Sequence, residues 1–162
     1  MSIRKCIEKF QQYHQDPDYV YNSATDESGL SRYITIYKKN NSQTNESRKN
    51  IVDKEYALYR ADQLQKILML DKFTLDIVQQ FNVHTTVYDD EKFKTTTFRT
   101  YKNMFDTERV DGPGIYYYRS IGPAFYEGLD DPKLQYSGVH CEWDVDGALQ
   151  FARSLIDGKI VM

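Results

Sequence analysis

Apolar residues recur at helical spacing at the start of the chain, at Ile3, Cys6, Ile7 and Phe10, with charged residues between them. Positions three and four apart share one face of a helix, so this pattern predicts an amphipathic helix over residues 2–14. It carries only three basic residues and one acidic residue, which make a poor cationic face compared with that of helices that lie on membrane surfaces. We therefore expect this helix to pack on the rest of the protein.

Further along, alternating β-branched and aromatic residues predict strands. Residues 30–39 are predicted as one strand, and residues 83–102 as a β-hairpin about the turn "DDEK". Residues 56–73 fit either a helix or a buried strand, because a short apolar run such as "KILML" is compatible with both. Residues 74–81 are predicted as a helix, since Thr74 is suited to cap its first turn.

A polar stretch, "KNNSQTNESRKN" at residues 39–50, contains no hydrophobic anchor. Such a composition predicts an exposed loop without regular structure. We therefore expect an N-terminal helix and strand segment at residues 1–50, an α+β body at 51–134 and a hairpin unit packed on it at 135–162.

Three consecutive tyrosines follow a tight turn at Gly112-Pro113-Gly114. Successive side chains of a strand point to opposite faces, so a strand "IYYY" places Ile115 and Tyr117 on one face and Tyr116 and Tyr118 on the other. We expect the first pair to be buried and the second pair to lie on a more accessible face that is suited to binding.

Two Asp-Gly pairs, Asp146-Gly147 and Asp157-Gly158, each lie between apolar or aromatic runs. Asp-Gly in this setting predicts a tight β-hairpin, because type I′ turns need positive φ angles. The apolar residues 160–162 then form an edge strand with unpaired amides. Such a strand either folds back against Trp143 or pairs with a second copy to give a homodimer.

Together these elements predict an α+β fold with a mainly antiparallel sheet, short covering helices at residues 2–14, 74–81 and 120–128, and β-hairpins at its C-terminal end. The composition agrees, since 14 tyrosines against 8 phenylalanines favour half-buried sheet positions. At 162 residues with 40% apolar residues, the chain is long enough to bury a core.

Charge and cysteine content exclude several classes of protein. The net charge is −3 and the 21 basic residues are scattered, so nucleic acid is not an expected partner. No apolar run is long enough for a membrane span or a secretory signal, so we expect neither membrane insertion nor secretion. Cys6 and Cys141 are then expected to be free thiols in a reducing compartment.

The sequence offers no converging catalytic or metal-binding set. His14, His84 and His140 are far apart, and His140 and its neighbour Cys141 point to opposite faces of a strand. The pairs Asp130-Asp131 and Asp144/Asp146 flank turns. We therefore predict a non-enzymatic protein without metal, cofactor or catalytic residues.

One enzymatic alternative stays open. Tyr59-Arg60, the hydroxyl-rich strand "TTTFR" at residues 95–99 and a later acid resemble the Arg, Ser/Thr and Glu order of ADP-ribosyltransferases. The Glu-x-Glu of those enzymes is absent, and Glu142-x-Asp144 is the nearest replacement. The resemblance implies an enzyme that acts on host proteins.

The C-terminal part resembles a MORN-type repeat, in which Tyr-x-Gly, an aromatic core residue and a closing Gly mark each hairpin. Tyr136-Ser137-Gly138, Trp143, Asp146-Gly147 and Asp157-Gly158-Lys159 match that pattern. The body, through "YRAD", "KILML", "FRTYK" and "GIYYY", resembles a module of large DNA viruses of the marseillevirus type. This resemblance covers roughly residues 55–162.

The resemblance implies a viral protein that acts in the cytoplasm or nucleus of the host cell, or in the virion, as a binding or structural component. Its partner would be a host or viral protein. The candidate binding surface consists of four aromatic residues, Tyr116, Tyr118, Tyr126 and Trp143.

Overall fold

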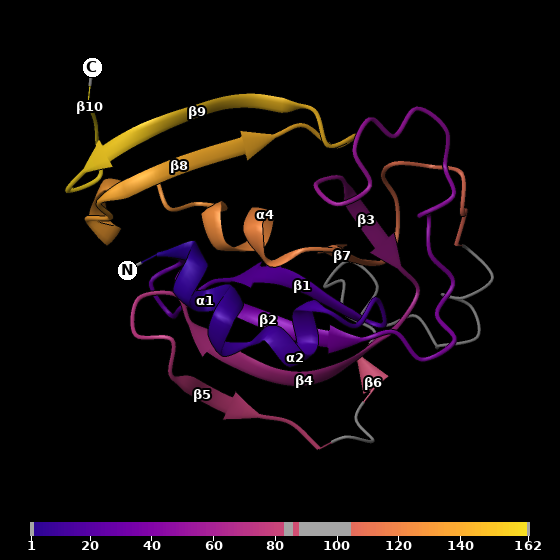
Figure 1. Ribbon diagram of the computed structural model, residues 1–162. Helices are drawn as coiled ribbons and strands as arrows, with labels where there is room; N and C mark the ends of the chain where they lie inside the picture. The colour runs from indigo at the N-terminus through magenta and orange to yellow at the C-terminus, as the bar shows by residue number, and fades with distance from the viewer. Residues whose placement is uncertain (1, 83–85, 88–104, 162) are drawn as a thin grey trace.

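The computed structural model describes residues 2–82, 86–87 and 105–161, in which two antiparallel sheets lie on either side of the short helix α4 (Figure 1). The larger sheet has the strand order β3 (Leu58–Ala61), β7 (Ile115–Tyr118), β1 (Tyr19–Ala24), β2 (Tyr33–Lys38), β4 (Leu64–Asp71), β5 (Ile77–Gln80), with β6 (Thr86–Val87) also paired to β4. The smaller sheet has the order β10 (Lys159–Val161), β9 (Leu149–Ile156), β8 (Gly138–Trp143).

The helices are short, namely α1 (Ile3–Lys9), α2 (Gln11–His14), α4 (Ile121–Tyr126) and the 3-10 turn η2 (Pro132–Leu134). The predicted N-terminal helix is confirmed. Ser2 caps α1, where its hydroxyl accepts a hydrogen bond from the Lys5 amide, and the helix is interrupted at Phe10. The α+β class, with mainly antiparallel sheets, few helices and C-terminal hairpin strands, is also confirmed.

The strands from residues 1–50 stand in the middle of the larger sheet. β1 pairs with β2 on one side and with β7 on the other, and β2 also pairs with β4. Both faces of β1 are covered, since Val20 belongs to one buried cluster and the neighbouring Tyr21 to the other. The first 50 residues and the body therefore share one sheet.

The ambiguity over residues 56–73 is resolved as two strands, β3 and β4. The prediction of a helix at residues 74–81 is wrong. The Asp71 carboxylate accepts hydrogen bonds from the Phe73 and Thr74 amides, and Leu75 has a φ of 62°, so the chain turns back. The following residues pair with β4 as strand β5. The predicted hairpin at 83–102 lies outside the described residues, except for β6.

Residues 39–50 form a loop without helix or strand, as predicted, but the expectation that this loop is exposed is wrong. Asn45 and Arg48 are buried within it. The Asn45 side chain donates to the Arg109 carbonyl oxygen and accepts from the Arg60 amide, which joins the loop to β3 and to the segment before β7. Polar residues without an apolar anchor can therefore be held inside a protein when backbone groups supply their partners.

Arg48 connects the two sheets. Its guanidinium donates to the Leu58 carbonyl oxygen on β3 at 2.9 Å and to the Val145 carbonyl oxygen after β8 at 2.6 Å. It also lies 3.4 Å from an Asp146 carboxylate oxygen and 5.3 Å from the centroid of the Tyr59 ring. The planar guanidinium presents several donors in a fixed geometry, so one side chain holds acceptors from two sheets.

Arg48→Lys is expected to destabilise the protein by about 3 kcal/mol, because an ammonium group cannot reach both buried carbonyl oxygens and one of them loses its partner. Urea unfolding measures this change. The control is Arg109→Lys, since the Arg109 side chain is largely exposed. Equal midpoints for the two variants would contradict the role given to Arg48.

The alternation predicted for "IYYY" is confirmed for its first three residues. Ile115 and Tyr117 are buried and Tyr116 is 36% exposed. Tyr117 pairs with Tyr59 across β3 and β7, with ring centroids 5.7 Å apart. Tyr118 differs from Tyr116, because it is half-buried and packs against the larger core cluster.

Tyr117→Ala is expected to lower the free energy of unfolding by about 3 kcal/mol or more, the usual cost of emptying an aromatic core position. Tyr116→Ala, one residue away on the exposed face, is expected to cost about 1 kcal/mol or less. Thermal or urea unfolding distinguishes them, and similar losses in the two variants would show that the faces are assigned wrongly.

The smaller sheet contains one tight turn and one longer loop. Asp157 and Gly158 have φ angles of 50° and 79°, as a type I′ turn requires, so this hairpin is confirmed. The loop that contains Asp146-Gly147 is longer than the predicted two-residue turn. The Asp144 amide donates to the Ala148 carbonyl oxygen across the loop, and the Asp144 carboxylate accepts from two loop amides.

The Tyr-Ser-Gly sequence has a physical basis. The Tyr136 hydroxyl donates to the Val139 carbonyl oxygen at 2.6 Å and so lies directly over Gly138. A Cβ atom at Gly138 would come within 2.7 Å of that hydroxyl oxygen, and the Gly138 φ is 144°. The Ser137 hydroxyl accepts from the Asp157 amide. These contacts fix the start of β8 against the last hairpin.

β10 pairs with β9 and forms one edge of the smaller sheet. Ile160 and Val161 are exposed, at 55% and 45%. One of the two predicted outcomes was that the last strand folds back against Trp143. The Trp143 ring instead stacks on Tyr56. Self-association through this edge stays a prediction. Among the described helices, none is long and apolar enough to cross a membrane.

Candidate functional site

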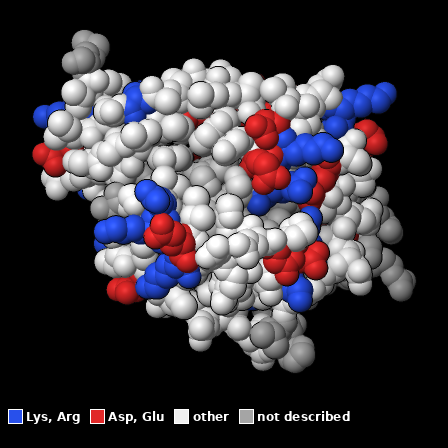
Figure 2. All heavy atoms as spheres, in the orientation of Figure 1, with Lys and Arg blue, Asp and Glu red and all other residues white. Residues whose placement is uncertain are grey.

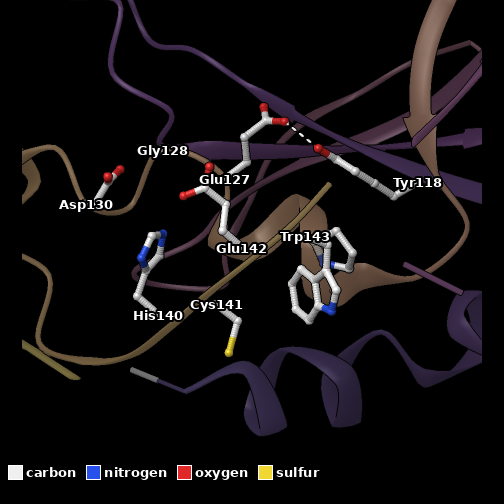
Figure 3. A pocket seen from close by; sticks show the side chains of 9 residues that line it. Tyr118, Glu127, Gly128, Asp130, His140, Cys141, Glu142 and Trp143 are labelled. Atoms are coloured by element: carbon white, nitrogen blue, oxygen red, sulfur yellow. Dashed lines mark hydrogen bonds between the residues drawn. The ribbon is translucent and has the colours of Figure 1, made fainter. Parts of the chain in front are cut away.

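A pocket of about 180 Å³ lies between the end of α4 and β8, where the smaller sheet meets the larger one (Figure 3). The end of β7, helix α4 with the residues after it, and β8 all contribute to its wall. The lining residues are Tyr118, Pro123, Glu127, Gly128, Asp130, His140, Cys141, Glu142 and Trp143.

Two carboxylates and a tyrosine hydroxyl converge on one side of the pocket. The Tyr118 hydroxyl donates to a Glu127 carboxylate oxygen at 2.7 Å (Figure 3). Burial raises the pKa of Tyr118, and the nearby Glu127 and Glu142 carboxylates raise it further. Tyr118 is therefore a neutral donor at physiological pH. Within the described part of the chain, the Glu142 carboxylate makes no hydrogen bond or ion pair.

An aromatic group forms another part of the wall. The Trp143 ring stacks on Tyr56, with centroids 4.7 Å apart and planes 7° from parallel. It also lies 6.1 Å from the ring of Tyr126. Aromatic contacts of this kind fix the indole in one orientation, so it forms a rigid wall.

Glu142 also comes together with Asp130 and His140, so it lies between this pair and Glu127 (Figure 3). One ligand-type atom from each lies within 4.8 Å of the others. His140 and Glu142 are two residues apart on β8, and Asp130 follows α4. Sequence spacing gave no indication of this group, because Asp130 is brought to β8 only by the packing of α4 under the smaller sheet.

Arg153 already supplies a positive charge to this group. It stands opposite His140 in the β8–β9 pairing. Its guanidinium lies 3.2 Å from an Asp130 carboxylate oxygen and donates from Nε to His140 Nδ1 at 3.3 Å. Burial lowers the pKa of His140, which favours the neutral imidazole that accepts this bond. A metal ion here would have to displace Arg153.

His140 and Cys141 do not form a nucleophile and base pair. The imidazole points toward Asp130 and Glu142, whereas the Cys141 sulfur points away (Figure 3). Burial raises the pKa of the Cys141 thiol, so the reactive thiolate is disfavoured. The prediction that the two side chains point to opposite faces of the strand is confirmed.

The structure brings two of the four predicted binding residues together. Tyr118 and Trp143 line the pocket. Tyr126 is buried, at 8% exposure, and supports the pocket wall from inside. Tyr116 lies apart, where its hydroxyl contacts the backbone of Gly112.

The residues behind the ADP-ribosyltransferase resemblance are placed differently. Arg60 is fully buried, and its guanidinium donates to the carbonyl oxygens of Asp106, Arg109 and Pro113. It therefore holds the segment before β7 and is not presented to a nucleotide. The strand at 95–99 lies outside the described residues.

Lys72 supports the pocket from behind. It is fully buried, and its ammonium donates to the Ser23 hydroxyl at 2.9 Å and to the Glu127 carbonyl oxygen at 2.8 Å. These bonds tie the end of α4 to β1 and β4, and so fix where Glu127 lies. Burial lowers the pKa of Lys72 to about 7, although the Glu127 carboxylate opposes the shift.

The pKa of Lys72 predicts a pH-dependent stability. The folded protein releases this proton at about pH 7, whereas the unfolded chain keeps it up to the ordinary pKa of 10.5. Because the unfolded state then binds more protons, the free energy of unfolding contributed by Lys72 rises with pH above 7, by about 1 kcal/mol per pH unit.

Urea unfolding of the wild type and of Lys72→Met between pH 6.5 and 8.5 isolates this contribution, since other groups titrate in both proteins. The difference in free energy of unfolding is expected to move in favour of the wild type as the pH rises. Lys5→Met, at an exposed position, is the control and is expected to parallel the wild type. A difference between wild type and Lys72→Met that does not change with pH would contradict the titration of a buried Lys72.

The surface around the pocket is not basic. In the view of Figure 2, acidic and basic groups are intermixed over the larger sheet, and the part over β8 and β9 is mostly uncharged. Nonspecific nucleic-acid binding relies on clustered basic residues. Comparison of the chain with protein-family models, with curated proteins and with solved structures finds no match.

Proposed function

We propose that this protein is a non-enzymatic protein-binding component of a large DNA virus, acting in the infected host cell or in the virion. The viral assignment rests on the resemblance of the body and the C-terminal hairpins to marseillevirus-type modules. The binding role rests on one observation, the pocket beside α4, which combines a fixed aromatic wall with two carboxylates, Glu127 and Glu142, that form no ion pair among the described residues.

The size of the pocket favours a protein partner over a cofactor. Its volume of about 180 Å³ is below the roughly 300–1,000 Å³ of sites that enclose drug-sized ligands. A side chain that projects from another protein matches it better. Protein interfaces commonly place such a buried anchor in an aromatic-lined pocket, surrounded by a polar rim.

Affinity capture from infected-cell extract, with three forms of the protein, tests this function. The wild type is expected to recover a specific host or viral protein. Trp143→Ala is expected to lose it, because the aromatic wall is removed. Tyr116→Ala is the matched control, since it removes an exposed aromatic residue outside the pocket and is expected to retain the partner.

Circular dichroism shows whether Trp143→Ala is folded. If it is not, Glu142→Lys changes the pocket at an exposed position and is expected to give the same loss. Recovery of no specific partner by the wild type would overturn the proposed function. Retention of the partner by both pocket variants would show that binding uses another surface.

A further inference from the structure

We infer that the pocket between α4 and β8 receives the cationic end of a lysine or arginine side chain of the partner protein. This inference rests on the proposed function and names the chemistry of its ligand. Its basis is the shape of the cavity together with the distribution of charge inside it. The three carboxylates of the pocket differ in this respect.

The charge of one carboxylate is already compensated. Asp130 is paired with the Arg153 guanidinium, which also contacts His140. Glu127 instead accepts a hydrogen bond from the neutral Tyr118 hydroxyl. Glu142, close by, has neither a hydrogen bond nor an ion pair among the described residues. Glu127 and Glu142 therefore carry two negative charges that no ion pair among the described residues neutralises, and the nearby Lys72 ammonium acts on Glu127 only from behind the pocket wall.

Carboxylates alone do not make a binding site, since exposed acidic groups are common on protein surfaces. Here they stand in a cavity whose remaining wall is Trp143 and Pro123. An aromatic ring attracts a cation through its negatively charged face, and the alkyl stem of a lysine or arginine packs against apolar atoms. One long cationic side chain satisfies both parts of the wall.

Neutral and anionic side chains fit less well. An apolar side chain would bury the two carboxylates without a partner, which is costly. An aspartate or glutamate would be repelled by them. Arg153 shows that a guanidinium is accommodated beside the same strand, where it lies against the Phe151 ring at 4.4 Å and pairs with a carboxylate.

The site can be tested without knowledge of the partner, because Trp143 is the only tryptophan of the chain. Its fluorescence, and its indole N–H signal in a ¹⁵N NMR spectrum, report directly on the pocket. The probes are N-acetyl-arginine amide and N-acetyl-lysine amide. N-acetyl-citrulline amide is the neutral control, since it has nearly the same shape as the arginine probe.

At least one cationic probe is expected to change both signals saturably, with a dissociation constant of about 1 mM, and the citrulline probe is expected to bind about tenfold more weakly. Glu142→Gln, which keeps the shape and removes the charge, is expected to weaken the cationic probe about tenfold. Glu108→Gln, an identical change at an exposed position in the loop before β7, is expected to leave binding unchanged.

Equal binding of the arginine and citrulline probes, no saturable change with either cationic probe, or no effect of Glu142→Gln would each overturn the inference. These results are independent of partner capture. Failure of the probes with the partner still captured through the pocket would reject a cationic ligand and leave protein binding in place. Specific probe binding without any captured partner would support the site and reject the proposed function.

Discussion

Buried guanidinium groups that donate to backbone carbonyl oxygens hold this structure together. Arg48 joins β3 to the loop after β8, and Arg60 joins β3 to the segment that leads into β7. Most of the described hydrogen bonds of both guanidinium groups go to backbone carbonyl oxygens. Each satisfies several carbonyl groups that would otherwise be buried without donors, which is the costlier condition in a protein interior. The position of the smaller sheet depends on Arg48 in particular.

The pocket is a consequence of that position. Its wall combines the end of a central strand, the C-terminal end of α4 and one strand of the smaller sheet, so it exists only while the two sheets are held together. Lys72 fixes the α4 side through the Glu127 carbonyl oxygen, and Tyr56 fixes the β8 side by stacking on Trp143. The side chains that face the pocket are therefore preorganised, which reduces the entropic cost of binding a ligand.

Local features were predictable from the sequence, because their causes lie within a few residues. The N-terminal helix, the burial of Tyr117 and the turn at Asp157-Gly158 all follow from periodicity or turn chemistry. The sequence analysis placed Tyr118 and Trp143 on one candidate binding surface, but it did not predict the pocket that both residues line. The burial of Arg48 was not predictable, because its acceptors lie 10 and 97 residues away. The prediction of a helix at residues 74–81 was wrong because the Asp71 carboxylate accepts hydrogen bonds from two following amides, and the chain turns there.

The place of β7 in the larger sheet has a consequence for how the chain folds. β7 lies between β3 and β1, which are both much earlier in the sequence. Until residues 115–118 are synthesised, β1 lacks its partner on one side, and β3 has its pairing with the loop at Thr44 but no strand that joins it to the larger sheet. Contacts between residues far apart in sequence slow folding, and open strand edges promote aggregation in the meantime. Completion of this sheet is therefore a late event on the ribosome, and the first hundred residues are the part of the nascent chain that most needs protection by chaperones.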